Sequence, residues 1–280
     1  MPSSLEKLRQ EIDRIDDNLH ALIMQRGRAV EQIAELDEAD ALLRPGREAE
    51  ILRRLVSRHQ GRFPKATLIR LWRELIGGMC GVQGQMTVAV YMPERGAGYL
   101  ELARDQYGAY TPMTAYTSPG QVVRAVADGS ALVGVLPTPD REDIEPWWIT
   151  LMGDGTPRII ARLPFAGPGQ GRGDGVEALA IGRLNPDPTG YDRSWMAVET
   201  LPDISRARLR AVLGAAGLEP TDLAATQRAE DRWLHLVEIS GALSPDDRRI
   251  ARLIDRKEPV EHCVVLGGYP VPLSAEDLSE

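Results

Sequence analysis

Residues 5–36, LEKLRQEIDRIDDNLHALIMQRGRAVEQIAEL, decide the fold of the N-terminal part of this 280-residue chain. Apolar residues recur along this stretch at steps of three and four, which is the spacing of one face of an α-helix. The same step places Arg26 within that apolar face. Residues 65–86 repeat the arrangement with an apolar stripe that continues to Gln83. The stripe comprises Leu68, Trp72, Leu75, Met79 and Gln83.

Arg26 and Gln83 are therefore polar residues at positions that the helical pattern would bury. A buried guanidinium or amide costs several kcal/mol unless it has polar partners. We expect these helices to enclose a polar, anionic ligand. Two plainer interpretations stay open: Arg26 extends to the surface or joins a buried ion pair, and Gln83 lies at a fraying helix end.

Three stretches together resemble the all-helical family of chorismate mutases. They are residues 5–36, RPGREAEILRRL at 44–55 and FPKATLIRLWRELIGGMCGVQ at 63–83. The order and spacing of these pieces carry the resemblance, which covers residues 5–86. It implies a helical homodimer with sites built from both subunits. It also implies the rearrangement of chorismate to prephenate without a cofactor or a metal.

The resemblance also implies roles for individual residues. Arg26, Arg47 and the partner subunit's Arg9 match carboxylate-binding arginines, a role that suits the bidentate fork of a guanidinium. Glu48 matches the residue that holds the substrate hydroxyl, and Gln83 matches the donor to the ether oxygen. A dianionic substrate folded into a compact chair needs such fixed cations and donors.

Three positions depart from the family pattern. Asp37 stands where the family has a lysine that contacts a carboxylate and the ether oxygen. Met79 stands where a serine is frequent, and Arg44 where an acidic residue often precedes the Arg-Glu pair. Losing one preorganised donor costs roughly 3 to 4 kcal/mol, so Asp37 predicts a weakened site. We hypothesise that Arg44 swings in to bind the substrate as a substitute cation.

The composition is that of a soluble globular protein, with 43% hydrophobic and 26% charged residues, and its length suits two or three compact units. No apolar run is long enough to cross a bilayer, and the charged start MPSSLEKLRQE predicts no signal peptide. We therefore expect a cytoplasmic protein with no membrane partner. The net charge of −8 lies beyond residue 86, because residues 1–86 carry 14 Lys and Arg against 13 Asp and Glu. A nucleic-acid partner is not expected.

Cysteine and histidine usage gives no sign of a metal site. Cys80 and Cys263 fall in different expected domains, which argues against a disulfide framework and against a cysteine-ligated metal. The four histidines are scattered without the spacing of metal ligands. The pair Trp147 and Trp148 is more typical of hydrophobic packing than of a ligand stack.

From residue 87 the pattern changes to short apolar strands that alternate with helices, which indicates an α/β lobe over 87–184. The stretch from VAVYMPERG to ALVGVLP resembles the first lobe of prephenate dehydratases. The Thr-Arg-Phe motif of that family is missing at DGVEALAIGRL, and the unit has about half the usual length. We therefore expect a truncated lobe without dehydratase activity, in which the glycine-rich stretch 167–175 is a flexible connection that replaces most of the second lobe.

Residues 194–273 predict the order β-α-β-β-α-β, which resembles the ACT regulatory domain. Neither phenylalanine-binding motif of that family is present, so we expect this tail to support dimerisation through its sheet edges.

The sequence thus predicts a multidomain protein with an all-α mutase domain at 1–86, an α/β lobe and an α+β ACT-like tail. Its expected function is chorismate mutase, in phenylalanine and tyrosine synthesis. The alternative is a catalytically impaired mutase-like protein that regulates or scaffolds the aromatic pathway. A working bifunctional enzyme is disfavoured by the missing motif.

Overall fold

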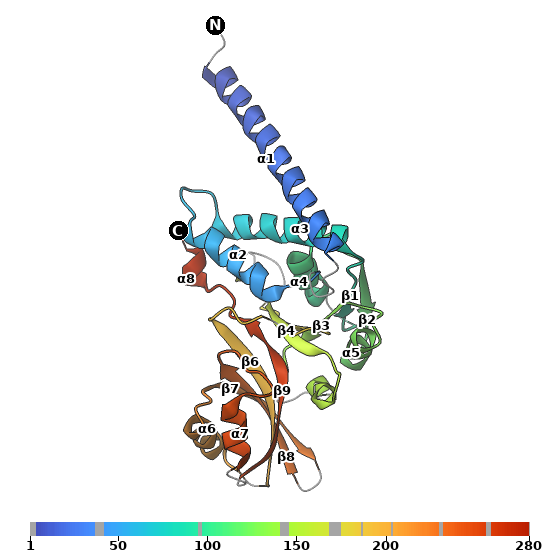
Figure 1. Cartoon of the computed structure of the whole chain (residues 1–280), viewed down its shortest axis with the longest axis vertical. Helices are drawn as coiled ribbons and strands as arrows, with labels where there is room; N and C mark the ends of the chain where they lie inside the picture. The colour runs from blue at the N-terminus through green and yellow to red at the C-terminus, as the bar shows by residue number, and fades with distance from the viewer. Residues whose placement is uncertain are drawn as a thin grey trace.

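The computed structural model describes residues 4–36, 42–94, 97–140, 146–167, 175–185, 187–202, 204–229, 232–255 and 259–279. The chain begins with three helices: α1 (Ser4–Glu35), α2 (Pro45–Ser57) and α3 (Lys65–Gln83). Pro45 opens α2, where its missing N–H costs nothing because the first turn has no intrahelical acceptor. Helices α2 and α3 lie against the rest of the molecule, whereas α1 projects away from it (Figure 1).

The described part of the lobe that follows contains five strands, two α-helices and one 3-10 helix. In chain order they are β1 (Val88–Tyr91), α4 (Gly98–Tyr107), β2 (Met113–Tyr116), α5 (Pro119–Ala127), β3 (Val133–Pro137), the 3-10 helix η1 (Trp147–Met152), β4 (Arg158–Leu163) and β5 (Ala178–Gly182). Strand β1 is parallel to β2 and β3, while β5 runs antiparallel between β3 and β4. The expected alternation of strands and helices is confirmed.

Alternating side chains of β1 explain why α4 and α5 cover opposite faces of this sheet. Val88 and Val90 pack in one cluster with Tyr107 of α4, whereas Ala89 packs in another with Val122 of α5. A strand covered on both faces reads as an unbroken apolar run, as VAV does here. The two tryptophans of η1 lie buried in the α5 cluster, as expected for hydrophobic packing.

The tail has the predicted β-α-β-β-α-β order. Its elements are β6 (Asp192–Thr200), α6 (Arg206–Ala215), β7 (Pro220–Ala229), β8 (Arg232–Ser240), α7 (Arg248–Asp255) and β9 (Val260–Pro270), followed by the short helix α8 (Ala275–Leu278). The strands lie in the order β9-β6-β8-β7, and each pair within the tail is antiparallel. Cys80 and Cys263 are both free thiols.

The lobe and the tail share one sheet. Its nine strands lie in the order β2-β1-β3-β5-β4-β9-β6-β8-β7, and β4 and β9 join its two halves in parallel at Ile159 and Gly267. A Cβ at Gly267 would stand 2.3 Å from the carbonyl oxygen of Ile159, and its φ of +120° also favours glycine. Strand β4 can approach β9 only because this position has no side chain.

Helix α1 differs from the sequence expectation, because its apolar stripe is not buried in the chain. No residue of α1 is buried, and the exposed fraction of the large apolar residues along the stripe runs from 43% at Ile33 to 60% at Leu22. The end of α1 meets α3 where a Cβ at Gly27 would lie 3.9 Å from the Met79 side chain. Periodicity identifies the apolar face of a helix but not what covers it.

The buried face of α3 is also not the stripe that the sequence suggested. Leu68, Trp72, Leu75 and Met79 are half-buried. The buried face comprises Ile69, Arg73, Ile76, Gly77 and Cys80, which point toward α2 and the lobe. The half-buried stripe that ends at Gln83 is left partly open to solvent.

Candidate active site

Charged residues from all three N-terminal helices gather around the Cys80 thiol. Burial raises the pKa of this thiol to about 12, and the carboxylate of Glu48 on α2 adds to the rise. The guanidiniums of Arg26 on α1 and Arg73 on α3 act in the opposite direction. Two predicted site residues, Arg26 and Glu48, are thus each close enough to Cys80 to act on its pKa, as is Arg73, which the sequence analysis did not select.

Arg26 lies where α1 reaches the other helices. Its side chain is half-buried, and its Nη1 is buried without a hydrogen-bond partner among the described residues. A buried guanidinium nitrogen without an acceptor costs free energy unless a ligand or another chain supplies one. The sequence left two plainer interpretations of Arg26 open, a surface position and a buried ion pair. Among the described residues, Nη1 fits neither, because it is buried and has no hydrogen-bond partner.

Glu48 forms a buried ion pair with Arg73. Oε2 of Glu48 accepts from Nη1 of Arg73 at 2.6 Å, and only 7% and 4% of the two residues are exposed. Burial lowers the pKa of Arg73, and the neighbouring Glu48 opposes this shift. The two opposite charges therefore stabilise each other away from water.

The other predicted residues are spread more widely. Arg47 is exposed and pairs with Glu50 at 3.2 Å, one turn further along α2. Gln83 is half-buried as the last residue of α3. Arg9 is exposed and precedes Arg26 by 17 residues of α1, which is about 26 Å along the helix axis. One chain therefore cannot bring Arg9 to Arg26.

The positions that depart from the family pattern have different surroundings. Asp37 lies outside the described residues. Met79 is half-buried beside Gly27. Arg44 is exposed and its Nη2 pairs with Asp187 at 2.6 Å, so its guanidinium is held by the loop after β5.

Arg73 is the residue that sequence reasoning missed. Its signal was of the kind that selected Arg26, because Ile69, Arg73, Ile76 and Cys80 follow steps of three and four. The neighbouring stripe that ends at Gln83 has larger apolar residues, so the sequence analysis took it as the buried face of α3. Two stripes on one helix cannot be ranked by periodicity when both are mostly apolar.

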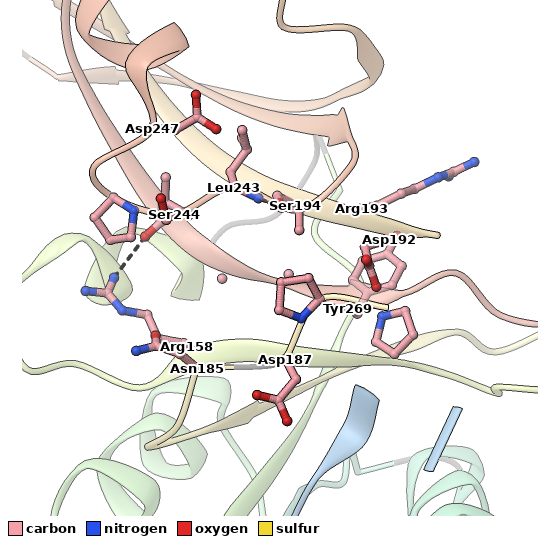
Figure 2. Close-up of a pocket in the computed structure, with 17 residues that line it drawn as sticks. Arg158, Asn185, Asp187, Asp192, Arg193, Ser194, Leu243, Ser244, Asp247 and Tyr269 are labelled. Carbon is pink, nitrogen blue, oxygen red and sulfur yellow. Dashed lines mark hydrogen bonds between the residues drawn. The ribbon is translucent and has the colours of Figure 1, made fainter. Parts of the chain in front are cut away.

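A separate cavity of about 400 Å³ opens between the lobe and the tail (Figure 2). Its charged lining residues are Arg158, Asp187, Asp192, Arg193 and Asp247. Each of them has a partner within the protein. For example, Nη1 of Arg158 donates to the carbonyl oxygen of Val265 at 3.0 Å. Because each of these charged groups already has a hydrogen-bond or ion-pair partner within the protein, we assign no chemistry to this cavity.

Two further properties were searched in the described part of the chain. Its His, Cys, Asp and Glu residues form no group of three or more that could hold a metal ion. None of its helices is both long enough and apolar enough to cross a membrane.

Comparison with known proteins identifies the helical segment. Residues 8–84 match the family Chorismate mutase type II. The bifunctional chorismate mutase/prephenate dehydratase of Pseudomonas aeruginosa is 29% identical over 140 residues, which are 48% of this chain and 38% of the relative. The chain thus matches well under half the length of that relative. Since the alignment is longer than the mutase segment, the similarity continues into the following residues.

Two solved structures are similar over 70% of this chain. One is titled GqqA, a novel type of quorum quenching acylases, with 17% identity, a TM-score of 0.49 and all of that chain covered. The other is prephenate dehydratase from Arthrobacter aurescens in complex with L-Phe, with 13% identity, a TM-score of 0.48 and 92% of that chain covered.

By sequence, then, residues 8–84 form a chorismate mutase type II domain. A mixed-sheet region follows it. The comparisons support a mutase function for the helical domain.

Proposed function

We propose that this protein rearranges chorismate to prephenate. The observation that carries the proposal is the match of residues 8–84 to the type II family, together with Arg26 and Glu48, which both act on the buried Cys80 thiol where the three helices meet. Arg26 has a buried nitrogen with no acceptor among the described residues, which suits a carboxylate of the substrate. The rearrangement is intramolecular, so fixed cations and donors that hold the reactive chair supply the catalysis.

The active form in this proposal is a homodimer. The exposed stripe of α1 supports it, because soluble proteins rarely leave a continuous apolar face that long in contact with water. The distance between Arg9 and Arg26 supports it too, because only a second chain could deliver Arg9 to the site. In this arrangement Arg47 binds the second carboxylate and Gln83 donates to the ether oxygen.

The proposal includes a test for Arg44 as the substitute for the lysine missing at position 37. Arg44 pairs with Asp187 at the surface, where such pairs are worth at most about 1 kcal/mol, so the guanidinium can leave at little cost. Arg44→Ala should then abolish turnover while the fold survives. The matched variant Asp187→Asn removes the same ion pair and should keep turnover. Equal activity of the two variants would refute the substitution.

The remaining regions take supporting roles in this proposal. We propose no dehydratase activity, because the Thr-Arg-Phe motif is missing before β5. The tail resembles ACT domains in its element order and, in this proposal, adds to dimerisation through its outer edge strand β7.

The test of the function is the consumption of chorismate and the identity of its product with purified full-length protein. Prephenate formation that disappears in Arg26→Ala supports the proposal, and phenylpyruvate formation would reveal dehydratase activity. A folded dimer that does not turn over chorismate would contradict it. That result would favour the second candidate, a mutase-like regulator, which the charge reversal at Asp37 supports.

A further inference from the structure

The buried pair of Arg73 and Glu48 connects the candidate site to the lobe. Glu48 on α2 and Arg26 on α1 both act on the pKa of the Cys80 thiol, and Nη1 of Arg73 donates to the Glu48 carboxylate at 2.6 Å. A buried carboxylate with one short charge-assisted hydrogen bond has little freedom to reorient. The position of Arg73 therefore sets where the carboxylate of Glu48 points.

The lobe in turn holds Arg73. The guanidinium carbon lies 5.0 Å from the ring centre of Phe165, in the geometry of a cation–π contact. The side-chain amide of Gln106 on α4 lies beside the same guanidinium. With its carbonyl oxygen turned toward Arg73, Gln106 accepts from Nη1 at 2.9 Å and from Nη2 at 3.3 Å. Glu48, Phe165 and Gln106 thus contact Arg73 from three different segments.

The register of α3 on α4 is fixed as well. A Cβ at Gly77 would stand 2.2 Å from the carbonyl oxygen of Tyr107, so the two helix backbones approach directly. The Glu74 carboxylate accepts from the backbone N–H of Ala109 just beyond α4 at 3.0 Å. Arg73 therefore cannot shift along the lobe without breaking these contacts.

We propose that Arg73 is a positioning residue for Glu48, and that the lobe serves the mutase site by holding Arg73. The inference rests on the proposed function. Arg73 has two effects in it: it orients the carboxylate toward the substrate hydroxyl, and it neutralises a negative charge that would otherwise repel a dianionic substrate. In this proposal the lobe, which lacks the dehydratase motif, has a structural role in the mutase site.

The experiment compares two arginines of α3 in the full-length protein. Arg73→Met removes the buried partner of Glu48, and Arg70→Met removes an exposed partner of Asp105 less than one turn earlier. We expect Arg73→Met to raise KM and to lower kcat/KM about 100-fold. We expect Arg70→Met to stay within about twofold of the wild type, because its ion pair is exposed.

Two more variants keep the inference testable if Arg73→Met does not fold. Arg73→Lys keeps the charge but loses the fork, so it should restore most of KM and less of kcat. Gln106→Leu tests the lobe, and it should move KM in the same direction as Arg73→Met by a smaller factor. An unchanged KM in Gln106→Leu would refute the role of the lobe.

The outcomes separate this inference from the function on which it rests. A wild-type protein without turnover contradicts the proposed function. A wild-type protein with turnover, whose KM is unchanged in Arg73→Met, contradicts only the inference. In that case Arg73 stabilises the fold, and its loss lowers the fraction of active enzyme without changing how that enzyme binds.

Discussion

Helix α1 and the body of the molecule, which is the described part of residues 42–279, use apolar stripes in opposite ways. The large apolar residues of the α1 stripe are exposed, whereas α2 and α3 bury apolar residues such as Leu52 and Ile69 in one cluster with Phe165 and Leu273. Polar contacts reinforce the second interface, because Arg53 of α2 donates to the carbonyl oxygens of Tyr191 and Val271. A single chain can therefore complete the body, while most of the apolar stripe of α1 stays exposed beyond its contact with α3.

The difference also divides the candidate site. Glu48 and Arg73 belong to the body and have their partners within the chain. Arg26 belongs to α1, and its Nη1 has no partner among the described residues. The fold of one chain thus positions Glu48 and Arg73. The environment of Arg26 depends instead on the molecule that packs against α1.

The largest expected effect comes from placing a charge on the α1 stripe. Leu19→Asp should yield a monomer and reduce turnover of chorismate at least about 100-fold, because the site would lose the partner's Arg9. Sedimentation and a turnover assay measure the two effects. Gln10→Asp, on the opposite face of α1, should remain dimeric and active. A Leu19→Asp variant that is dimeric and fully active would contradict the proposal that the α1 stripe forms the dimer interface.

The next largest effect is a difference in stability when an apolar side chain is shortened in the body or on α1. Leu52 on α2 is fully buried, so Leu52→Ala should lower the free energy of unfolding by about 2 to 5 kcal/mol. In the monomeric Leu19→Asp background, Leu8→Ala on α1 should change it by no more than about 0.5 kcal/mol. Chemical denaturation monitored by tryptophan fluorescence gives both values. Equal losses would mean that α1 packs on the body.

Mild acid should lower the free energy of unfolding of the body, because His235 becomes protonated. Burial and, to a smaller extent, the nearby Arg206 lower the pKa of this histidine from 6.5 to about 4. The unfolded chain therefore binds the proton first, so stability present above pH 6.5 is lost as the pH falls toward 4, by up to about 3 kcal/mol. Unfolding free energies at pH 7 and 4.5 should differ less in His235→Gln. The same pH dependence in both proteins would exclude this cause.

The smallest effect concerns two adjacent glycines of α3. Gly77→Ala should cost about 1 to 3 kcal/mol, because its Cβ would strike the Tyr107 carbonyl on α4. Gly78→Ala meets nothing within 4 Å and should gain up to about 1 kcal/mol through helix propensity. Thermal unfolding of both variants tests how tightly α3 is fitted to the lobe. A stabilised Gly77→Ala would show a looser contact.

Local pattern predicted the helices and strands well, because spacing and turn residues determine them within a few positions. It did not predict the exposure of α1 or the joining of β4 to β9. Ile159 and Gly267 are 108 residues apart, and nothing local records their contact. The roles assigned to Arg9, Arg26, Arg47, Glu48 and Gln83 stay predictions. Arg73 shows that every apolar face of a helix should be searched for polar residues, because α3 has such residues on two faces.

The shared sheet limits how this chain can be divided. Its order of a helical unit, a lobe and a tail suggests modules that could be exchanged or removed. Strand β4 has β5 on one side and β9 on the other, so a deletion of the tail would expose the second edge of β4. Bare strand edges recruit other chains and promote aggregation. A shortened version of this protein is therefore better cut before the lobe's first strand or not at all, and recombination would have to move lobe and tail together.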